Sequence, residues 1–301
     1  MTRVQVPLGL KPAEQVLNEA FQLLGCEPWG GPSQNGWSKV SDYLRCPYRY
    51  YLKHLVEARA QGVAAASAAQ DIGSFVHAIL AAHYASFLVD ERYPGFRPRC
   101  PSVENLIVAL KTCGAEPLAL GKAEHLWWPY LDRWAEDGFG PLAVEMPVGD
   151  PELHTSRYDL VVDVLDGLHD GVWICEHKTL SPSTDVEIYQ LDGEILGECL
   201  SWRLSRLDDM FGPLLGVCLN VLVKSATPTY RRLWWPVNWD LVNDFGRNRM
   251  HWQATINART KQNIFPKSHY GCAARFDRCL FWDHCSTLSP SFLTLEDLTN
   301  E

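Results

Sequence analysis

The stretch SRYDLVVDVLDGLHDGVWICEHKTL, residues 156–180, contains the pattern that most strongly constrains the fold. Within it, residues 158–164 and 172–177 are short, rich in β-branched side chains and separated by two Asp-Gly pairs that favour turns. A third stretch of the same kind, residues 142–148, precedes them. The three stretches are therefore predicted to form an antiparallel β-meander.

Helical periodicity surrounds this meander on both sides. Apolar residues at helical spacing predict helices before it at residues 13–24, 38–45, 72–88, 103–113 and 123–136. After it, the sequence predicts a long helix at 186–210, strands at 215–224 and 229–236, and a last helix from Asn238 or Asp240 to about residue 260. This order of elements indicates an α/β or α+β protein whose sheet is flanked by helices.

Two carboxylates and a lysine fall on the predicted meander. Asp159 lies in one strand, and Glu176 and Lys178 point to one face of the next, because side chains alternate along a strand. Oxygen ligands of this kind suit Mg²⁺ or Mn²⁺, and a lysine can steady the negative charge of a phosphate undergoing hydrolysis. Solvated charges on an exposed sheet face are the alternative. Asp163 shares a face with Asp159, so the pattern does not decide which of the two is a ligand.

Four of the ten cysteines gather near two distant positions. Cys272, Cys279 and Cys285 form a C-x6-C-x5-C cluster, and Cys46-Pro47 lies far upstream. Four thiolates can hold a [4Fe–4S] cluster or a zinc ion, and the spacing does not choose between them. A small C-terminal knot of packed cysteines is the alternative. If the metal were zinc, nitrogen ligands are available from His269 and His284.

The charge of the chain is unevenly distributed. The net charge of −9 argues against binding of nucleic acid over the whole surface, but residues 230–279 contain nine basic and three acidic residues. Basic and aromatic side chains here are predicted to contact phosphates and stack on bases, namely Arg231, Arg232, Trp234, Arg247 and Arg249. A buried strand and helix with a solvated basic edge would give the same pattern.

Membrane association is not expected from the sequence. The first residues lack the long apolar stretch of a signal peptide, and no run approaches the roughly 20 apolar residues that span a bilayer. We therefore expect a cytoplasmic protein. Cys175, Cys199 and Cys218 lie in apolar or amphipathic segments and are expected to be small buried side chains.

Taken in order, six sequence elements resemble the RecB-like nucleases of the PD-(D/E)XK superfamily, which include AddB and CRISPR-associated RecB-like exonucleases. The resemblance covers about residues 38–286. It lies in Ser41–Tyr51 around Cys46-Pro47, the Gly73-Ser-Phe-Val-His77 helix, Ser156-Arg-Tyr-Asp159-Leu-Val-Val162, Glu176-His-Lys178-Thr179, Tyr189-Gln190-Leu191 and the C-terminal cysteines. Ser156 stands where the family usually has glycine, Glu176 where aspartate is commoner, and no tyrosine follows Gln190 at the family's spacing.

This resemblance implies a restriction-endonuclease-like fold and a set of site residues. His77, Asp159, Glu176 and the backbone carbonyl of His177 would bind Mg²⁺ or Mn²⁺. In the same family pattern, Lys178 would assist the attacking water and Gln190 would support the site. The remaining residues implied are Cys46, Cys272, Cys279 and Cys285, which would hold a structural [4Fe–4S] cluster that ties the two ends of the domain together.

The resemblance also implies domain limits and a function. Residues 1–37 would be an extension, 38–286 the nuclease domain with a helical insertion at about 78–138 and a cluster segment at about 262–286, and 287–301 a tail. We expect a DNA exonuclease acting on single strands or ends, with partners from recombination, repair or CRISPR adaptation. An accessory iron–sulfur DNA-binding subunit and a zinc-stabilised DNA-binding protein are the alternatives.

Overall fold

The computed structural model divides the chain into two compact units. The first contains residues 1–38 and 66–254, and the second contains residues 39–65 and 255–301. The residues that the structure describes are 11–27, 29, 33, 35–56, 68–88, 101–135, 138–268, 272, 279, 281 and 285. The predicted tail, residues 287–301, therefore lies outside the described residues, as does most of the predicted cluster segment.

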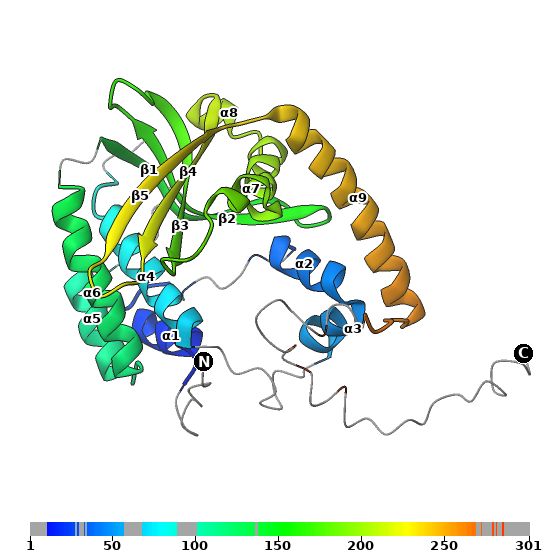
Figure 1. The fold of residues 1–301 in the computed structure, drawn as a ribbon, viewed down its shortest axis with the longest axis horizontal. Coiled ribbons are helices and arrows are strands. Elements are labelled where there is room, and N and C mark those ends of the chain that lie inside the picture. The colour runs from blue at the N-terminus through cyan, green and yellow to red at the C-terminus, as the bar shows by residue number, and fades with distance from the viewer. Residues whose placement is uncertain are drawn as a thin grey trace, which may run out of the picture. The chain divides into compact units, whose positions relative to one another are not determined.

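A five-stranded mixed sheet forms the centre of the first unit (Figure 1). Its strands lie in sequence order: β1 (Phe139–Asp150), β2 (His154–Val164), β3 (Gly171–Leu180), β4 (Leu214–Val223) and β5 (Thr229–Pro236). The first three strands form the predicted antiparallel meander. Strand β4 then pairs parallel to β3, and β5 returns antiparallel to β4. The expected α/β fold with a sheet flanked by helices is confirmed, and the sheet is mixed.

The composition of β4 explains its position inside the sheet, between β3 and the edge strand β5. Its sequence LLGVCLNVLV is apolar almost throughout, and nine of its ten residues are buried. A strand covered on both faces needs such a continuous apolar run, because neither face meets water. The edge strand β5 is only partly buried and carries the two arginines Arg231 and Arg232.

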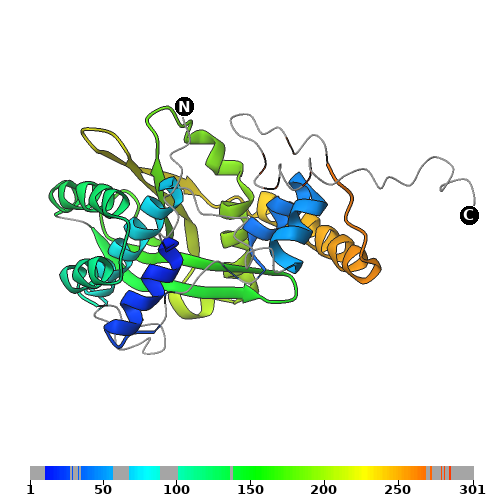
Figure 2. The same ribbon diagram turned by 90° about the horizontal axis from the view of Figure 1, so that it is seen from below.

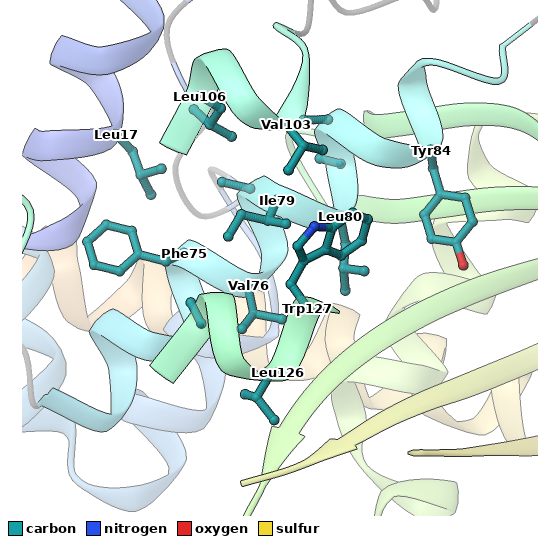
Figure 3. Packing of buried hydrophobic residues seen from close by; sticks show 14 of the residues in the cluster. Leu17, Phe75, Val76, Ile79, Leu80, Tyr84, Val103, Leu106, Leu126 and Trp127 are labelled. Atoms are coloured by element: carbon teal, nitrogen blue, oxygen red, sulfur yellow. The ribbon is translucent and has the colours of Figure 1, made fainter. Parts of the chain in front are cut away.

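One face of the sheet is covered by four helices, α1 (Ala13–Leu23), α4 (Ala68–Ala85), α5 (Val103–Thr112) and α6 (Pro117–Arg133). Figure 3 shows how Leu17, Phe75, Ile79, Leu106 and Trp127 from these helices pack in the same core. Sheet residues, including Cys175 and Cys218, join this core as expected for buried cysteines. The helices predicted as an insertion at about 78–138 thus share one core with the sheet.

The opposite face is covered by α7 (Gly193–Leu204), α8 (Asp208–Phe211) and the first part of α9 (Trp239–Gln262) (Figures 1 and 2). Trp202 is completely buried there and lies beside Tyr158 of β2. Helices on both faces of the sheet leave the middle of the strands dry, so polar side chains there need specific partners.

Two predicted helices differ from the structure. The long helix expected at 186–210 is divided into the 3₁₀ helix η4 (Glu187–Leu191), α7 and α8. A new helix begins at α7 because Asp192 is its N-cap, with a side chain that accepts the N–H of Glu194. Soon after the end of α7, Arg206 has a left-handed backbone at φ +53°, which separates α7 from α8. Helix α6 begins at Pro117 rather than at Ala123, because Glu116 caps it and proline is favoured in a first turn.

The second unit contains most of α2 (Trp37–Arg45), α3 (Pro47–Tyr50), the π-helix η1 (Tyr51–Leu55) and the end of α9. Cys46 precedes α3 in an extended conformation, and Pro47 begins the helix as predicted. Tyr43, Tyr50 and Ile256 form a small core. No helix in the described part of either unit has the length and apolar character to span a membrane.

Candidate active site

A cavity of about 680 Å³ opens in the first unit where α4 and α7 meet the meander. Four residues singled out from the sequence line it together: His77, Asp159, Glu176 and Lys178. Four further acidic residues that the sequence reasoning missed also line it: Glu14, Glu145, Glu194 and Glu198. The cavity is therefore strongly acidic, with Lys178 and Arg157 as the cations beside His77.

Strand register brings three of the carboxylates into one row. Leu160 pairs with Cys175, so the preceding Asp159 lies next to Glu176 on the neighbouring strand. Glu145 lies opposite Asp159 in the register of β1 and β2. The row therefore crosses three adjacent strands, and all three members face the cavity.

Asp159 connects three elements. Its Oδ1 lies 3.2 Å from Nδ1 of His77, and its Oδ2 accepts the backbone N–H of His177 at 2.8 Å. Helix α4 can approach β3 this closely because a Cβ on Gly73 would already lie 3.2 Å from Thr179 Oγ1. Burial opposes charge on both partners, but the attraction between them outweighs it. The pKa of Asp159 therefore lies well below its usual range, and that of His77 rises to about 9.

Lys178 is held between two carboxylates. Its Nζ donates to Oε1 of Glu176 and to Oε2 of Glu194, each at 2.6 Å. Burial lowers the pKa of Lys178, but the two carboxylates outweigh burial and raise it well above its usual range. The pKa of Glu176 is raised to about 8, mainly by burial and next by the negative charge of Asp159. A cation bound beside Glu176 would offset the negative charge of the neighbouring carboxylates and so favour the ionised form of Glu176.

Glu198 and Glu145 are the missed residues with the most unusual surroundings. Glu198 is 3% exposed, and its Oε2 has no hydrogen-bond partner among the described residues. Glu145 has a left-handed backbone at φ +50°, which is rare for a residue with a Cβ. In the sequence, Glu145 could have been recognised only as an isolated acidic residue in an apolar strand. The signal of Glu198 was its spacing of four from Glu194 on one helix.

Comparison with known proteins decides the family. The family model of the PD-(D/E)XK nuclease superfamily matches residues 37–192, just over half of the chain. The chain belongs to this superfamily. Among solved structures it is similar to a crystal structure from Eubacterium rectale described as "Putative exonuclease", with 12% identity, a TM-score of 0.49, and coverage of 90% of this chain and 99% of that chain. No curated protein matches the chain.

Membership in the PD-(D/E)XK superfamily gives the cavity a context. A nuclease acts on nucleic acid, and nucleases of this superfamily typically use a divalent metal ion. Carboxylate oxygens and an imidazole nitrogen fit Mn²⁺ or Mg²⁺ chemically. In the described ranges, no three His, Cys, Asp or Glu side chains already have the arrangement of a metal site. Instead, the side chains of the cavity contact one another: His77 pairs with Asp159, and Lys178 pairs with Glu176.

Of the other residues considered from the sequence, Gln190 and Asp163 lie outside the described cavity lining, and His177 was expected to contribute only its backbone carbonyl. Gln190 is exposed on η4 and is not among the described residues that line the cavity, whereas its neighbour Tyr189 has its ring centroid 6.0 Å from Lys178 Nζ. The His177 side chain is buried, with its Nδ1 3.0 Å from Asn220 Nδ2, and burial lowers its pKa to about 3. Asp163, the alternative to Asp159, is likewise absent from the described cavity lining.

The residues expected to bind nucleic acid need correction. Arg249 is fully buried, where its guanidinium donates to His154 Nδ1 at 3.0 Å and to the Leu153 carbonyl. It cannot reach a phosphate backbone, because these contacts build it into the core. Arg232 is packed between the rings of Trp134 and Phe139, at 3.8 and 3.7 Å from their centroids.

The other three also lie outside the described cavity lining. Trp234 stacks on His169 with ring centroids 4.1 Å apart, so this face of its ring is already covered. Arg231 and Arg247 are exposed, and Arg247 pairs with Asp244. The arginine that does line the cavity is Arg157, whose buried Nε has no hydrogen-bond partner among the described residues.

The second unit of this PD-(D/E)XK chain has a smaller pocket lined by all four singled-out cysteines, Cys46, Cys272, Cys279 and Cys285. Cys46 Sγ accepts the N–H of Ser268 at 3.3 Å, and Cys272 Sγ lies 3.5 Å from the Ser268 carbonyl oxygen. Four sulfur donors in one pocket fit a soft metal centre. His269 and His284, the nitrogen donors considered for zinc, lie outside the described residues.

Proposed function

We propose that this chain is a divalent-metal-dependent DNA nuclease that hydrolyses phosphodiester bonds at the cavity between α4, α7 and the meander. The observation that supports this most directly is the convergence of His77, Asp159, Glu176 and Lys178, which come from three separate elements. A set of solvated surface charges would not be held together by buried contacts such as those of Asp159 with His77 and His177.

The roles follow from the chemistry of each group. His77, Asp159 and Glu176 would hold Mg²⁺ or Mn²⁺, with the backbone of His177 beside them. Such an ion polarises a phosphate and lowers the pKa of bound water. The ammonium of Lys178 would orient the attacking water and stabilise negative charge that develops on the phosphate. Gln190 is omitted from this set, because it does not line the described cavity.

Arg157 is the proposed phosphate contact in the cavity. Its NH1 donates to the backbone oxygen of Glu145 at 3.4 Å, and its buried Nε has no hydrogen-bond partner among the described residues, so its guanidinium has donor capacity that a phosphate could use. The exposed side chains of Arg231 and Arg247 remain candidates for more distant parts of the strand. Arg232, Trp234 and Arg249 are omitted, because they are occupied by internal packing.

The proposed substrate is a single DNA strand or the end of a DNA strand. A cavity of about 680 Å³ lies within the size of ordinary small-ligand pockets, roughly 300–1,000 Å³. Such a space suits a few unpaired nucleotides better than a duplex. We propose exonuclease action on such a strand. The proposed partners are proteins of recombination, repair or CRISPR adaptation, as the family resemblance implies.

A [4Fe–4S] cluster is the proposed occupant of the cysteine pocket. Cys46 comes from before α3, whereas the other three ligands come from the far end of the chain. A cluster held by all four would cross-link segments that are distant in sequence and stabilise the second unit. Its role is therefore proposed to be structural.

Cleavage of end-labelled DNA tests the enzyme. Single-stranded and double-stranded DNA, with RNA for comparison, would be incubated with anaerobically purified protein and Mn²⁺, Mg²⁺ or EDTA. We expect metal-dependent cutting that is lost in Glu176→Ala and Lys178→Ala and kept in Asp163→Asn. The Asp163 variant is a matched control, because this residue lies on β2 but not in the described cavity lining. No cutting under any condition would favour the accessory DNA-binding subunit instead.

A further inference from the structure

Helix α7 presents two glutamates to the two functional side chains of β3. Glu194 and Glu198 are four residues apart on the helix, which corresponds to a rise of about 6 Å. Glu176 and Lys178 are two residues apart on the strand, which corresponds to roughly 6.7 Å. Because the two spacings match, each glutamate can face one side chain of the strand, and all four line the same cavity.

The contact between Glu194 and Lys178 is direct. Lys178 Nζ lies 2.6 Å from Glu194 Oε2, the same distance as from Glu176 Oε1. The lysine side chain is 16% exposed, whereas that of Glu194 is 44% exposed. Glu194 therefore reaches the buried ammonium from the outer side of the cavity, and Glu176 reaches it from the strand.

The start of α7 is fixed, so the position of Glu194 is fixed as well. Asp192 caps the helix by accepting the N–H of Glu194 at 2.8 Å. Gly193 lies against the indole of Trp37, where a Cβ would come within 2.5 Å of ring atoms. Trp37 is in turn packed against Phe245. The first turn of the helix cannot shift without disturbing this packing.

The two anchors of Lys178 differ once a cation is bound. Glu176 is a proposed metal ligand, so a divalent cation there would compete with the ammonium for its oxygens and repel it. Glu194 is not among the proposed ligands and keeps its contact with the ammonium. We propose that Glu194 is a positioning residue that holds Lys178 in place when the metal site is loaded. This inference rests on the proposed nuclease function.

Substitution of Glu194 tests this role. Glu194→Ala removes the acceptor and its charge, whereas Glu194→Gln keeps an acceptor and removes the charge. We expect kcat for DNA cleavage to fall by roughly 10-fold to 100-fold in Glu194→Ala, which is the scale of a misplaced reacting group, and less in Glu194→Gln. KM should stay within about two-fold, because Lys178 acts on the transition state. Glu187→Ala is the matched control, since Glu187 is an exposed glutamate of η4 outside the described cavity lining.

Binding of Mn²⁺ measured by calorimetry separates positioning from ligation. A positioning residue leaves the Mn²⁺ dissociation constant within about two-fold, whereas loss of a ligand or its support weakens binding by roughly 10-fold to 100-fold. A wild-type kcat in Glu194→Ala, or Mn²⁺ binding weakened on that larger scale, would overturn the role assigned to Glu194. If wild-type protein cut no DNA, the nuclease proposal and this inference would both be rejected. Cutting that needs Lys178 but not Glu194 would reject only the inference.

Discussion

Asp159 accepts the backbone N–H of His177 with one carboxylate oxygen and lies 3.2 Å from the imidazole of His77 with the other. One side chain of β2 thereby fixes both the neighbouring strand and helix α4. The pairing also neutralises Asp159 before any metal binds, because the pKa of His77 is raised to about 9 despite burial. Metal binding must therefore compete with a proton on His77.

This competition predicts that Mn²⁺ affinity rises with pH. A raised folded-state pKa stabilises the fold fully below the unfolded value of 6.5, and this stabilisation is lost as pH rises through about 9. Glu176, with a pKa of about 8, must also lose its proton. Calorimetry at pH 6.5 and at pH 9, in buffers of different ionisation enthalpy, should show tighter binding at the higher pH and proton release. Equal Mn²⁺ affinity at both pH values would contradict this prediction.

The left-handed backbone of Glu145 predicts a trade between stability and function. At φ +50° a Cβ costs about 1 kcal/mol or more, which glycine avoids. We therefore expect Glu145→Gly to be about 1 kcal/mol more stable to urea than Glu145→Ala. DNA cleavage should fall in both variants, because Glu145 lines the cavity opposite the proposed metal ligand Asp159. Equal stability of the two variants would show that the left-handed conformation carries no strain. Cleavage at the wild-type rate would show that the carboxylate has no role.

Arg249 and Arg247 are two residues apart on α9, and their substitution should change stability by very different amounts. Arg249→Ala leaves His154 and the Leu153 carbonyl without their partner in the core, so we expect a loss of about 3 kcal/mol in the free energy of unfolding. Arg247→Ala removes only an exposed ion pair with Asp244 and should change it by less than about 0.5 kcal/mol. Urea denaturation measures both. Similar small effects would mean that the buried contacts contribute little.

Substitution of Cys279 tests the proposed cluster. Cys279 is buried in the cysteine pocket and lies 3.9 Å from an Arg49 nitrogen. We expect Cys279→Ser to lose iron and visible absorption and to unfold at a lower temperature. Cys113→Ser should keep the iron and the visible absorption, because Cys113 belongs to the first unit and is not among the described residues that line the pocket. Colourless wild-type protein containing zinc would replace the cluster with a zinc site.

The sequence predicted the central part of the site because local rules determine it. The two Asp-Gly turns and the alternation of β2 and β3 were enough to bring Asp159 beside Glu176. The helix carrying Gly73 and His77 was also recognised, since its apolar spacing is regular. Buried cysteines in the strands followed from their apolar neighbours.

The rest depended on contacts that no local pattern encodes. Glu145 faces the cavity with its own backbone in the left-handed conformation, and this interrupts the alternation of side chains on which strand predictions rely. Arg249 looks like a solvated helix charge until His154, distant in sequence, is placed beside it. The division of the 186–210 helix depended on one cap at Asp192, and it put Tyr189 rather than Gln190 beside Lys178.

The topology of the sheet has a consequence for the order of folding. Strands β1, β2 and β3 are consecutive and joined by short turns, so the carboxylate row needs only low-contact-order hairpin pairing. The parallel pairing of β4 with β3 requires the crossover through α7, which closes a longer loop and is slower. We expect Glu145, Asp159 and Glu176 to come together early, and Lys178 to gain its contact with Glu194 only when the crossover docks. During refolding, the acidic row would therefore form before Lys178 is held in the position proposed for cutting DNA.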